Sequence, residues 1–124
     1  MSLYLLDTHI LLWWLINSEK LSQKHLLLIN NPDNLILVST ASIWEIVLKQ
    51  ATGKLNIPED LSFILDDNNI EILDITMEHA LQVKNLPLWH NDPLDRILIA
   101  QCMTENLTLI TVDKLISKYD IKSI

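Results

Sequence analysis

Residues 90–101 read HNDPLDRILIAQ, and they place two carboxylates, the only arginine of the chain and an apolar helix in twelve residues. Asp92 is expected to be the N-cap of that helix and Pro93 its first residue. Asp95 falls in the first turn, where backbone N–H groups and the helix dipole favour negative charge. This local role explains both carboxylates. A functional interpretation adds that Asp95 faces outward at the top of a sheet while the following apolar residues carry the helix into the core.

The chain is long enough for one globular domain, residues 1–124, and too short for a second. It has 124 residues, of which 49% are hydrophobic and 20% charged. Cys102 is the only cysteine, so an intrachain disulfide is excluded, and its apolar surroundings favour an inert core thiol. The longest apolar run, residues 10–16, is far shorter than the roughly 20 residues that span a bilayer. We therefore expect a cytoplasmic protein without export or membrane segments.

The net charge of −7 argues against a protein that binds nucleic acid mainly by neutralising phosphates. An acidic pocket that requires a cation is compatible with this charge. Lys49 and Lys54 flank the end of one predicted helix, and the other lysines suggest a solvated face.

Short apolar strands alternate with helices along the chain, which predicts an α/β domain with a mostly parallel sheet of four or five strands. The strands are expected at residues 3–6, 35–38, 70–73, 107–111 and, as an edge strand, 121–124. Helices are expected at residues 9–17, 23–29, 39–51, 58–66 and 77–86, the last capped by Thr76, and from residue 93 onward. A further helix is expected at residues 114–119, with Asp113 as a plausible N-cap. Right-handed crossovers place the carboxyl ends of parallel strands at one edge, where ligands bind.

The helix at residues 9–17 is apolar on every face between Ile10 and Ile16. Such a helix is either central to the core or partly covered by another chain. We expect some of each.

Four carboxylates are predicted at the ligand-binding edge. Asp7 and Asp113 directly follow apolar strands, Glu45 lies on the helix after the second strand, and Asp95 lies in the first turn of the helix before the fourth. If the strands at 3–6 and 107–111 are neighbours, all four side chains converge.

Glu45 has two possible roles. Its spacing from Ser42 is that of a capping box, in which the carboxylate reaches back to a backbone N–H. An earlier cap at Ser39 or Thr40 would instead leave Glu45 inside the helix between Trp44 and Ile46, where a carboxylate needs a partner or a metal.

Four carboxylates about 5 Å apart repel one another by roughly 3 kcal/mol per pair at an effective dielectric constant near 20. Such a site needs protons or a cation, and an all-oxygen donor set suits Mg²⁺, with Mn²⁺ as a substitute. The histidines lack zinc-ligand spacing, and neither His9 nor His90 is expected to bind the ion. A metal at this site would support phosphodiester hydrolysis without a covalent nucleophile.

Supporting roles are predicted for residues near these carboxylates. The hydroxyls of Thr8, Ser39 and Thr111 either orient waters and carboxylates or simply cap local structure. Arg96 either contacts phosphate or balances Asp95 or Asp92, and we favour the second role.

Four segments resemble PIN-domain ribonucleases, specifically the VapC-type toxins of bacterial toxin–antitoxin pairs. They are LLDTHILLW (5–13), STASIWEIVLKQATGKL (39–55), HNDPLDRILIAQ (90–101) and LTLITVD (107–113), in order over nearly the whole chain. The resemblance implies a three-layer α/β/α domain with strand order 3-2-1-4-5, Mg²⁺-dependent RNA cleavage, homodimers and inhibition by a cognate antitoxin. Carried over position by position, it implies the acidic quartet Asp7, Glu45, Asp95 and Asp113, with Asp92 as a helix cap or supporting group.

The acidic net charge then predicts modest RNA affinity with a shallow salt dependence. RNA binding would depend on the metals and on a dimer groove containing Lys49 and Lys54, with Trp89 and His90 as further contacts. For Trp89, however, packing on the domain is favoured over stacking on a base.

Other classes fit less well. An aspartyl phosphatase would have a second Asp two residues after Asp7, where His9 stands, and a receiver domain would need a phosphorylated Asp that Asp74 matches poorly. The alternative from another class is a catalytically silent module that dimerises or binds an antitoxin-like partner. Under either function, an antitoxin would lie on the apolar residues 10–16 and insert a basic side chain into the acidic pocket.

Overall fold

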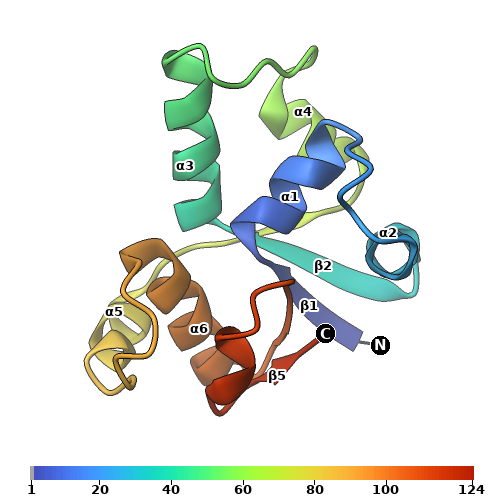
Figure 1. Ribbon diagram of the computed structural model, residues 1–124. Coiled ribbons are helices and arrows are strands. Elements are labelled where there is room, and N and C mark those ends of the chain that lie inside the picture. Colours follow the sequence, from blue (N-terminus) through green and yellow to red (C-terminus); the bar gives the residue numbers. More distant parts are fainter. Residues whose placement is uncertain (1) are drawn as a thin grey trace.

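A five-stranded sheet forms the centre of the molecule in a computed structural model that describes residues 2–124 (Figure 1). Its strands are β1 (Ser2–Leu6), β2 (Asn34–Ser39), β3 (Glu71–Leu73), β4 (Thr108–Ile110) and β5 (Lys122–Ser123). They lie in the order β3-β2-β1-β4-β5, and every neighbouring pair is parallel. The predicted fold class and strand order are therefore confirmed.

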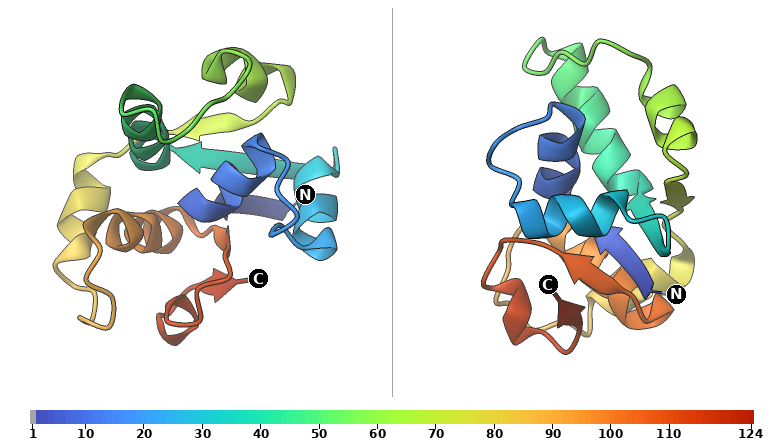
Figure 2. Two further views of the ribbon diagram at one scale, coloured as in Figure 1. Left: turned by 45° about the horizontal axis from the view of Figure 1, so that its top comes forward. Right: turned by 90° about the vertical axis from the view of Figure 1, so that its right-hand side faces the viewer.

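Helices cover both faces of this sheet and give three layers (Figure 2). They are α1 (Thr8–Leu15), α2 (Gln23–Asn30), α3 (Thr40–Ala51), α4 (Leu61–Asp67), α5 (Met77–Val83) and α6 (Pro93–Glu105), with one 3-10 turn, η1 (Ile116–Lys118). Among residues 2–124, no helix combines the length and apolar character needed to cross a membrane.

The two-residue period of the strands divides the core between the faces. Leu6 and Ile110 pack with the buried residues of α1 to α4, whereas Leu5 and Leu109 pack with those of α6. Since β1 pairs with both β2 and β4, its carboxyl end lies at the middle of the sheet edge.

The α1 helix is only partly central. Ile10 and Leu11 are fully buried, residues 12–15 are half-buried, and Ile16 is 45% exposed. The first half of the predicted apolar helix therefore belongs to the core, while whether another chain covers the second half stays a prediction.

Three predicted helices differ from the observed ones. The helix expected at residues 77–86 ends at Val83, because the N–H groups of Asn85 and Leu86 donate to carbonyls three residues back, in turns. The helix expected from Pro58 begins at Leu61, because the side chain of Asp60 accepts the Ser62 N–H and caps the helix there. The helix expected at residues 114–119 is only the η1 turn, because Asp113 Oδ1 accepts the Leu115 N–H in a local turn. Asp113 is therefore a turn residue and not an N-cap.

Candidate active site

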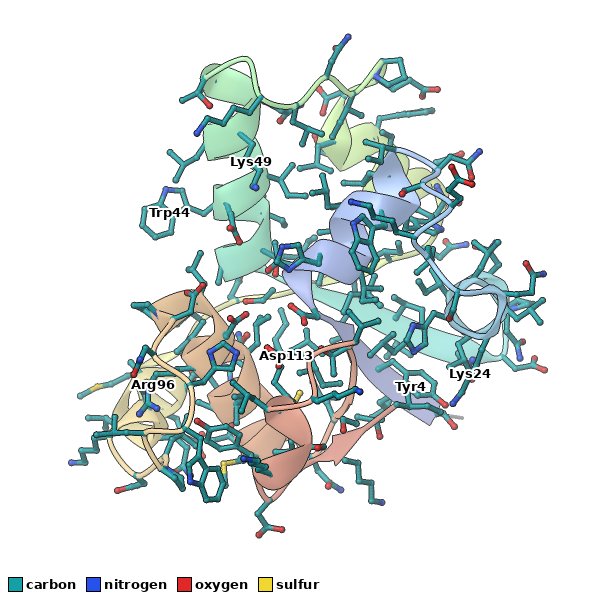
Figure 3. The ribbon with its side chains drawn as sticks, in the orientation of Figure 1. Tyr4, Lys24, Trp44, Lys49, Arg96 and Asp113 are labelled. Carbon is teal, nitrogen blue, oxygen red and sulfur yellow. The ribbon has the colours of Figure 1, made fainter. Side chains whose placement is uncertain are left out.

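The carboxyl ends of β1 and β4 bring Asp7 and Asp113 to the same edge of the sheet. The Asp7 N–H donates to the Ile110 carbonyl at 3.0 Å, which ties the end of β1 to β4, and Asp7 is only 3% exposed. Asp113 comes two residues after Thr111, just beyond the carboxyl end of β4 (Figure 3).

The start of α6 adds the third carboxylate. Asp92 accepts the Leu94 N–H at 2.9 Å and Pro93 is the first helical residue, so the predicted cap is confirmed. Asp95 lies in the first turn, and burial together with the negative charge of Asp7 raises its pKa to about 6. This carboxyl resists ionisation first because it is buried and second because the negative charge of Asp7 is near.

Thr111 links the first two carboxylates. Its hydroxyl donates to Asp7 Oδ2 at 2.6 Å and accepts the Asp113 N–H at 3.0 Å. The structure thus places Thr111 between two members of the predicted quartet, where it fixes their relative positions.

His90 lies among the carboxylates. Its Nε2 is 2.6 Å from Asp113 Oδ2 and 3.4 Å from Asp95 Oδ2, and the ligand atoms of these three residues lie within 4.8 Å of one another. The hydrogen bond to Asp113 raises the pKa of His90. Burial acts to raise the pKa of Asp113, but the hydrogen bonds from His90 and the Leu115 N–H outweigh it and lower that pKa.

Asp7 also carries an unsatisfied oxygen. Its Oδ1 is buried and has no hydrogen-bond partner among residues 2–124. A buried charged oxygen without a partner is destabilising unless a cation or a donor approaches it. Asp7, like Glu45, lies outside the group of ligand atoms formed by His90, Asp95 and Asp113, but its negative charge is close enough to raise the pKa of Asp95. Carboxylate oxygens gathered in this way suit a hard divalent cation.

Glu45 occupies the interior of α3. Ser39 is the N-cap of that helix and accepts the Ala41 N–H at 3.1 Å, so the earlier of the two possible caps is correct. The Ser42 hydroxyl instead hydrogen-bonds Thr8 Oγ1 at 2.8 Å, which joins α1 to α3. Glu45 is half-buried and lies outside the group formed by His90 and the two carboxylates, so its membership of the quartet stays a prediction.

The fold and these carboxylates agree with the match to protein families. Residues 4–122 match the model of the PIN domain. The chain belongs to the PIN-domain family.

Solved structures resemble this PIN domain over nearly its whole length. VapBC2 from Rickettsia felis bound to a promoter DNA fragment is 18% identical, with a TM-score of 0.72, and the match covers 99% of this chain and 98% of that chain. DNA-bound VapBC from Salmonella typhimurium is 17% identical, with a TM-score of 0.68 and coverage of 100% and 98%. A toxin–antitoxin complex from Klebsiella pneumoniae is 20% identical, with a TM-score of 0.66 and coverage of 100% and 96%. At these identities the likeness is one of fold. No curated protein sequence matches the chain.

Arg96 of the PIN domain does not have its predicted role. None of the ion pairs within residues 2–124 involves Arg96, so it balances neither Asp95 nor Asp92. Its guanidinium is buried and donates to backbone carbonyls of the segment before α6 (Figure 3). Successive helical residues point about 100° apart, so Arg96 faces that segment while Asp95 faces the site.

The predicted RNA contacts lie on different parts of the surface. Trp89 packs edge-on against Tyr119 with ring centroids 5.0 Å apart, as its favoured structural role predicted. Lys49 is half-buried on α3, four residues after Glu45, and Lys54 is exposed beyond the end of that helix. Trp44 projects away from α3 into solvent and is 61% exposed (Figure 3).

The contacts of His90 and Tyr119 were missed in the sequence. The only available signal for His90 was its position two residues before the cap of the helix that carries Asp95. Tyr119 carried no signal, because its contact to residue 90 spans 29 residues of chain.

Proposed function

We propose that this PIN domain is a metal-dependent endoribonuclease whose catalytic carboxylates are Asp7, Glu45, Asp95 and Asp113. The observation that carries the proposal is the unpartnered, buried Oδ1 of Asp7 beside Asp95, whose pKa is raised to about 6. Uncompensated negative charge at the mouth of a parallel sheet is what a cation-dependent hydrolase requires.

The donor set supports Mg²⁺, with Mn²⁺ as a substitute, because both prefer carboxylate oxygens and keep positions open for water and phosphate. When bound, the ion would lower the pKa of the attacking water and stabilise the developing charge on phosphate oxygens. Asp7, Asp95 and Asp113 would hold it, and Glu45 would approach from α3. Thr111 keeps Asp7 and Asp113 in register through its two hydrogen bonds.

RNA binding in this proposal depends more on the ion than on lysines. The chain carries a net charge of −7, and we expect a shallow dependence of cleavage on salt. Lys49, one helical turn after Glu45, is the lysine best placed to approach the substrate phosphates.

We further propose that the nuclease is the toxin of a toxin–antitoxin pair. The similar structures from Rickettsia felis, Salmonella typhimurium and Klebsiella pneumoniae are VapBC or toxin–antitoxin complexes. An apolar cavity of about 540 Å³ supports a protein partner, and its lining includes Ile43, Val47, Leu61, Leu65 and Ile72. An antitoxin segment with apolar side chains would fill this cavity, whose lining includes none of residues 10–16, so docking of the antitoxin on those residues stays a separate prediction. A basic side chain of the same partner would complement the acidic site.

A homodimer is the third element of the proposal. Trp44 and Leu48 lie one turn apart on α3 and are 61% and 49% exposed. A second copy of the chain covering these two side chains would remove them from water. Trp44→Glu should then convert a dimer to a monomer in sedimentation experiments, whereas a wild-type monomer would contradict the dimer.

The nuclease proposal is tested by incubating the purified protein with mixed cellular RNA in Mg²⁺, Mn²⁺ or EDTA. Wild type should cleave RNA only with metal, and Asp95→Asn and Glu45→Gln should be inactive. Glu78→Gln is the matched control, because Glu78 is also an acidic residue of a helical first turn but lies on α5.

Cleavage in EDTA, or an active Asp95→Asn variant, would overturn the metal site. An inactive wild type that is free of a copurified antitoxin would favour the silent interaction module.

A further inference from the structure

The segment between α5 and α6 carries His90 and has no regular secondary structure. Arg96 anchors this segment, together with the last residue of α5, by four hydrogen bonds to backbone carbonyls. The guanidinium donates to the carbonyls of Val83, Leu86, Pro87 and His90 at 3.0, 3.3, 2.8 and 3.2 Å. Because a buried cation without an anion must be compensated by dipoles, these four carbonyls and Arg96 stabilise one another.

A second anchor comes from the segment after η1. The Tyr119 hydroxyl accepts the His90 N–H at 2.9 Å and donates to the Pro87 carbonyl at 2.9 Å. Both backbone polar groups of His90 are therefore held by side chains from elsewhere in the fold, the N–H by Tyr119 and the carbonyl by Arg96. This arrangement fixes the point from which the imidazole extends.

The imidazole ends at Asp113. His90 Nε2 lies 2.6 Å from Asp113 Oδ2, while Asp113 Oδ1 accepts the Leu115 N–H at 2.9 Å. Each oxygen of Asp113 thus has one donor, and the plane of the carboxylate is set by His90 on one side and the backbone on the other. The His90 side chain is 14% exposed, so water competes little for this contact.

We propose that His90 is a positioning residue that orients Asp113 through its Nε2–H, and that Arg96 and Tyr119 are positioning residues that hold His90 in place. The inference rests on the proposed metal-dependent nuclease. A ring nitrogen that donates to a carboxylate has no lone pair to offer a metal, so this geometry opposes coordination of the ion through Nε2 of His90. Groups that orient metal-binding carboxylates typically change metal affinity or activity by about 10- to 100-fold.

Arginine suits the anchoring role better than lysine. Its planar guanidinium presents several donors in fixed directions and can reach four carbonyls at once, whereas a lysine ammonium is a single point on a flexible stem. Arg96→Lys therefore keeps the charge but loosens the segment.

The test uses Mn²⁺ as the probe and measures its affinity by electron paramagnetic resonance. His90→Ala should weaken Mn²⁺ binding about 10- to 100-fold, and His90→Gln, whose amide supplies a donor at a similar distance, should restore most of the loss. Arg96→Lys and Tyr119→Phe should each weaken binding in wild type but add little to His90→Ala, because they act through His90. Glu78→Gln is the control, since Glu78 is exposed in the first turn of α5, and affinity should stay within about twofold.

A second readout uses the metal-free protein. In ¹⁵N-histidine NMR spectra, the Nε2–H proton of His90 should be strongly hydrogen-bonded and should lose this signature in Asp113→Ala. This readout does not depend on nuclease activity. If Arg96→Lys fails to fold, Tyr119→Phe still tests whether loss of an anchor of His90 weakens the Nε2–H hydrogen bond.

The outcomes separate this inference from the nuclease proposal. If wild type binds no Mn²⁺, both are overturned. If wild type binds Mn²⁺ in a manner that requires Asp95 but His90→Ala binds equally well, only the positioning role is overturned. A directly bonded histidine nitrogen in the spectrum of the Mn²⁺ complex would also overturn it, in favour of His90 as a ligand.

Discussion

Replacing Asp95 with asparagine should stabilise the metal-free protein while abolishing its activity. Burial and the charge of Asp7 raise the pKa of Asp95 from its ordinary 3.8 to about 6. The folded protein therefore binds this proton more tightly than the unfolded chain, and the free energy of unfolding falls as the pH rises from about 4 to about 6. At about 1.4 kcal/mol per pH unit the full cost is about 3 kcal/mol, and partial solvent exposure of the side chain reduces it to about 1–3 kcal/mol.

Urea and thermal unfolding in EDTA measure this cost. At pH 7.5, Asp95→Asn should be more stable than wild type by about 1–3 kcal/mol, or roughly 3–9 °C in Tm for a domain of this size. At pH 4.5 the difference should fall below about 1 kcal/mol, because most of the wild-type carboxyl is then protonated. Saturating Mn²⁺ should reverse the order, since the ion stabilises only a protein that binds it.

Glu78→Gln again serves as the control and reports the loss of an ordinary first-turn carboxylate, a destabilisation of about 0.3–1 kcal/mol. If Asp95→Asn is no more stable than wild type in EDTA at pH 7.5, or if its advantage persists unchanged at pH 4.5, then burial and the charge of Asp7 do not oppose ionisation of Asp95, and the assignment of the site fails.

Three further outcomes follow from the site and the core. Mn²⁺ affinity, measured by calorimetry, should fall as the pH drops below about 6 because the ion competes with the proton on Asp95, and a flat profile between pH 5 and 8 would contradict the assignment. Thr111→Val removes the donor to Asp7 and the acceptor for the Asp113 N–H, and should lower RNA cleavage about 10- to 100-fold with a native circular dichroism spectrum; full activity would exclude a positioning role. Burial raises the pKa of Cys102 to about 12, so a thiol reagent at pH 8 should label it only after unfolding, and labelling of the native protein would place the thiol outside the core.

Local signals in the sequence were sufficient for most element boundaries. The Thr76 and Asp92 caps each depend on a side chain and an N–H two or three residues away, and both were predicted correctly. The predicted start of α4 was wrong. Both Pro58 and Asp60 are signals for the beginning of this helix, and the helix begins after the capping carboxylate of Asp60. The order of the strands needed the resemblance to PIN domains, because apolar periodicity does not say which strands pair.

Contacts between distant segments limited the prediction of the site. Arg96 was predicted to pair with the carboxylates nearest to it in the sequence. Its side chain instead leaves α6 on another face and donates to backbone carbonyls that precede the helix. The approach of His90 to Asp113 crosses 23 residues and depends on Tyr119, which no local pattern marks. Convergence of Asp7 and Asp113 was predictable, since both follow strands of one parallel sheet.

The hydrogen bond between Thr111 and Asp7 joins residues 104 positions apart, and this separation has a consequence during translation. A nascent chain that already includes Asp7, Glu45 and Asp95 still lacks Asp113. It also lacks β4, the strand that pairs with β1 and hydrogen-bonds the N–H of Asp7. The carboxylate site therefore cannot assemble while the ribosome is still synthesising the first hundred residues. Under the proposed function, RNA cleavage would therefore begin only when β4 has emerged and paired with β1, late in the synthesis of the chain.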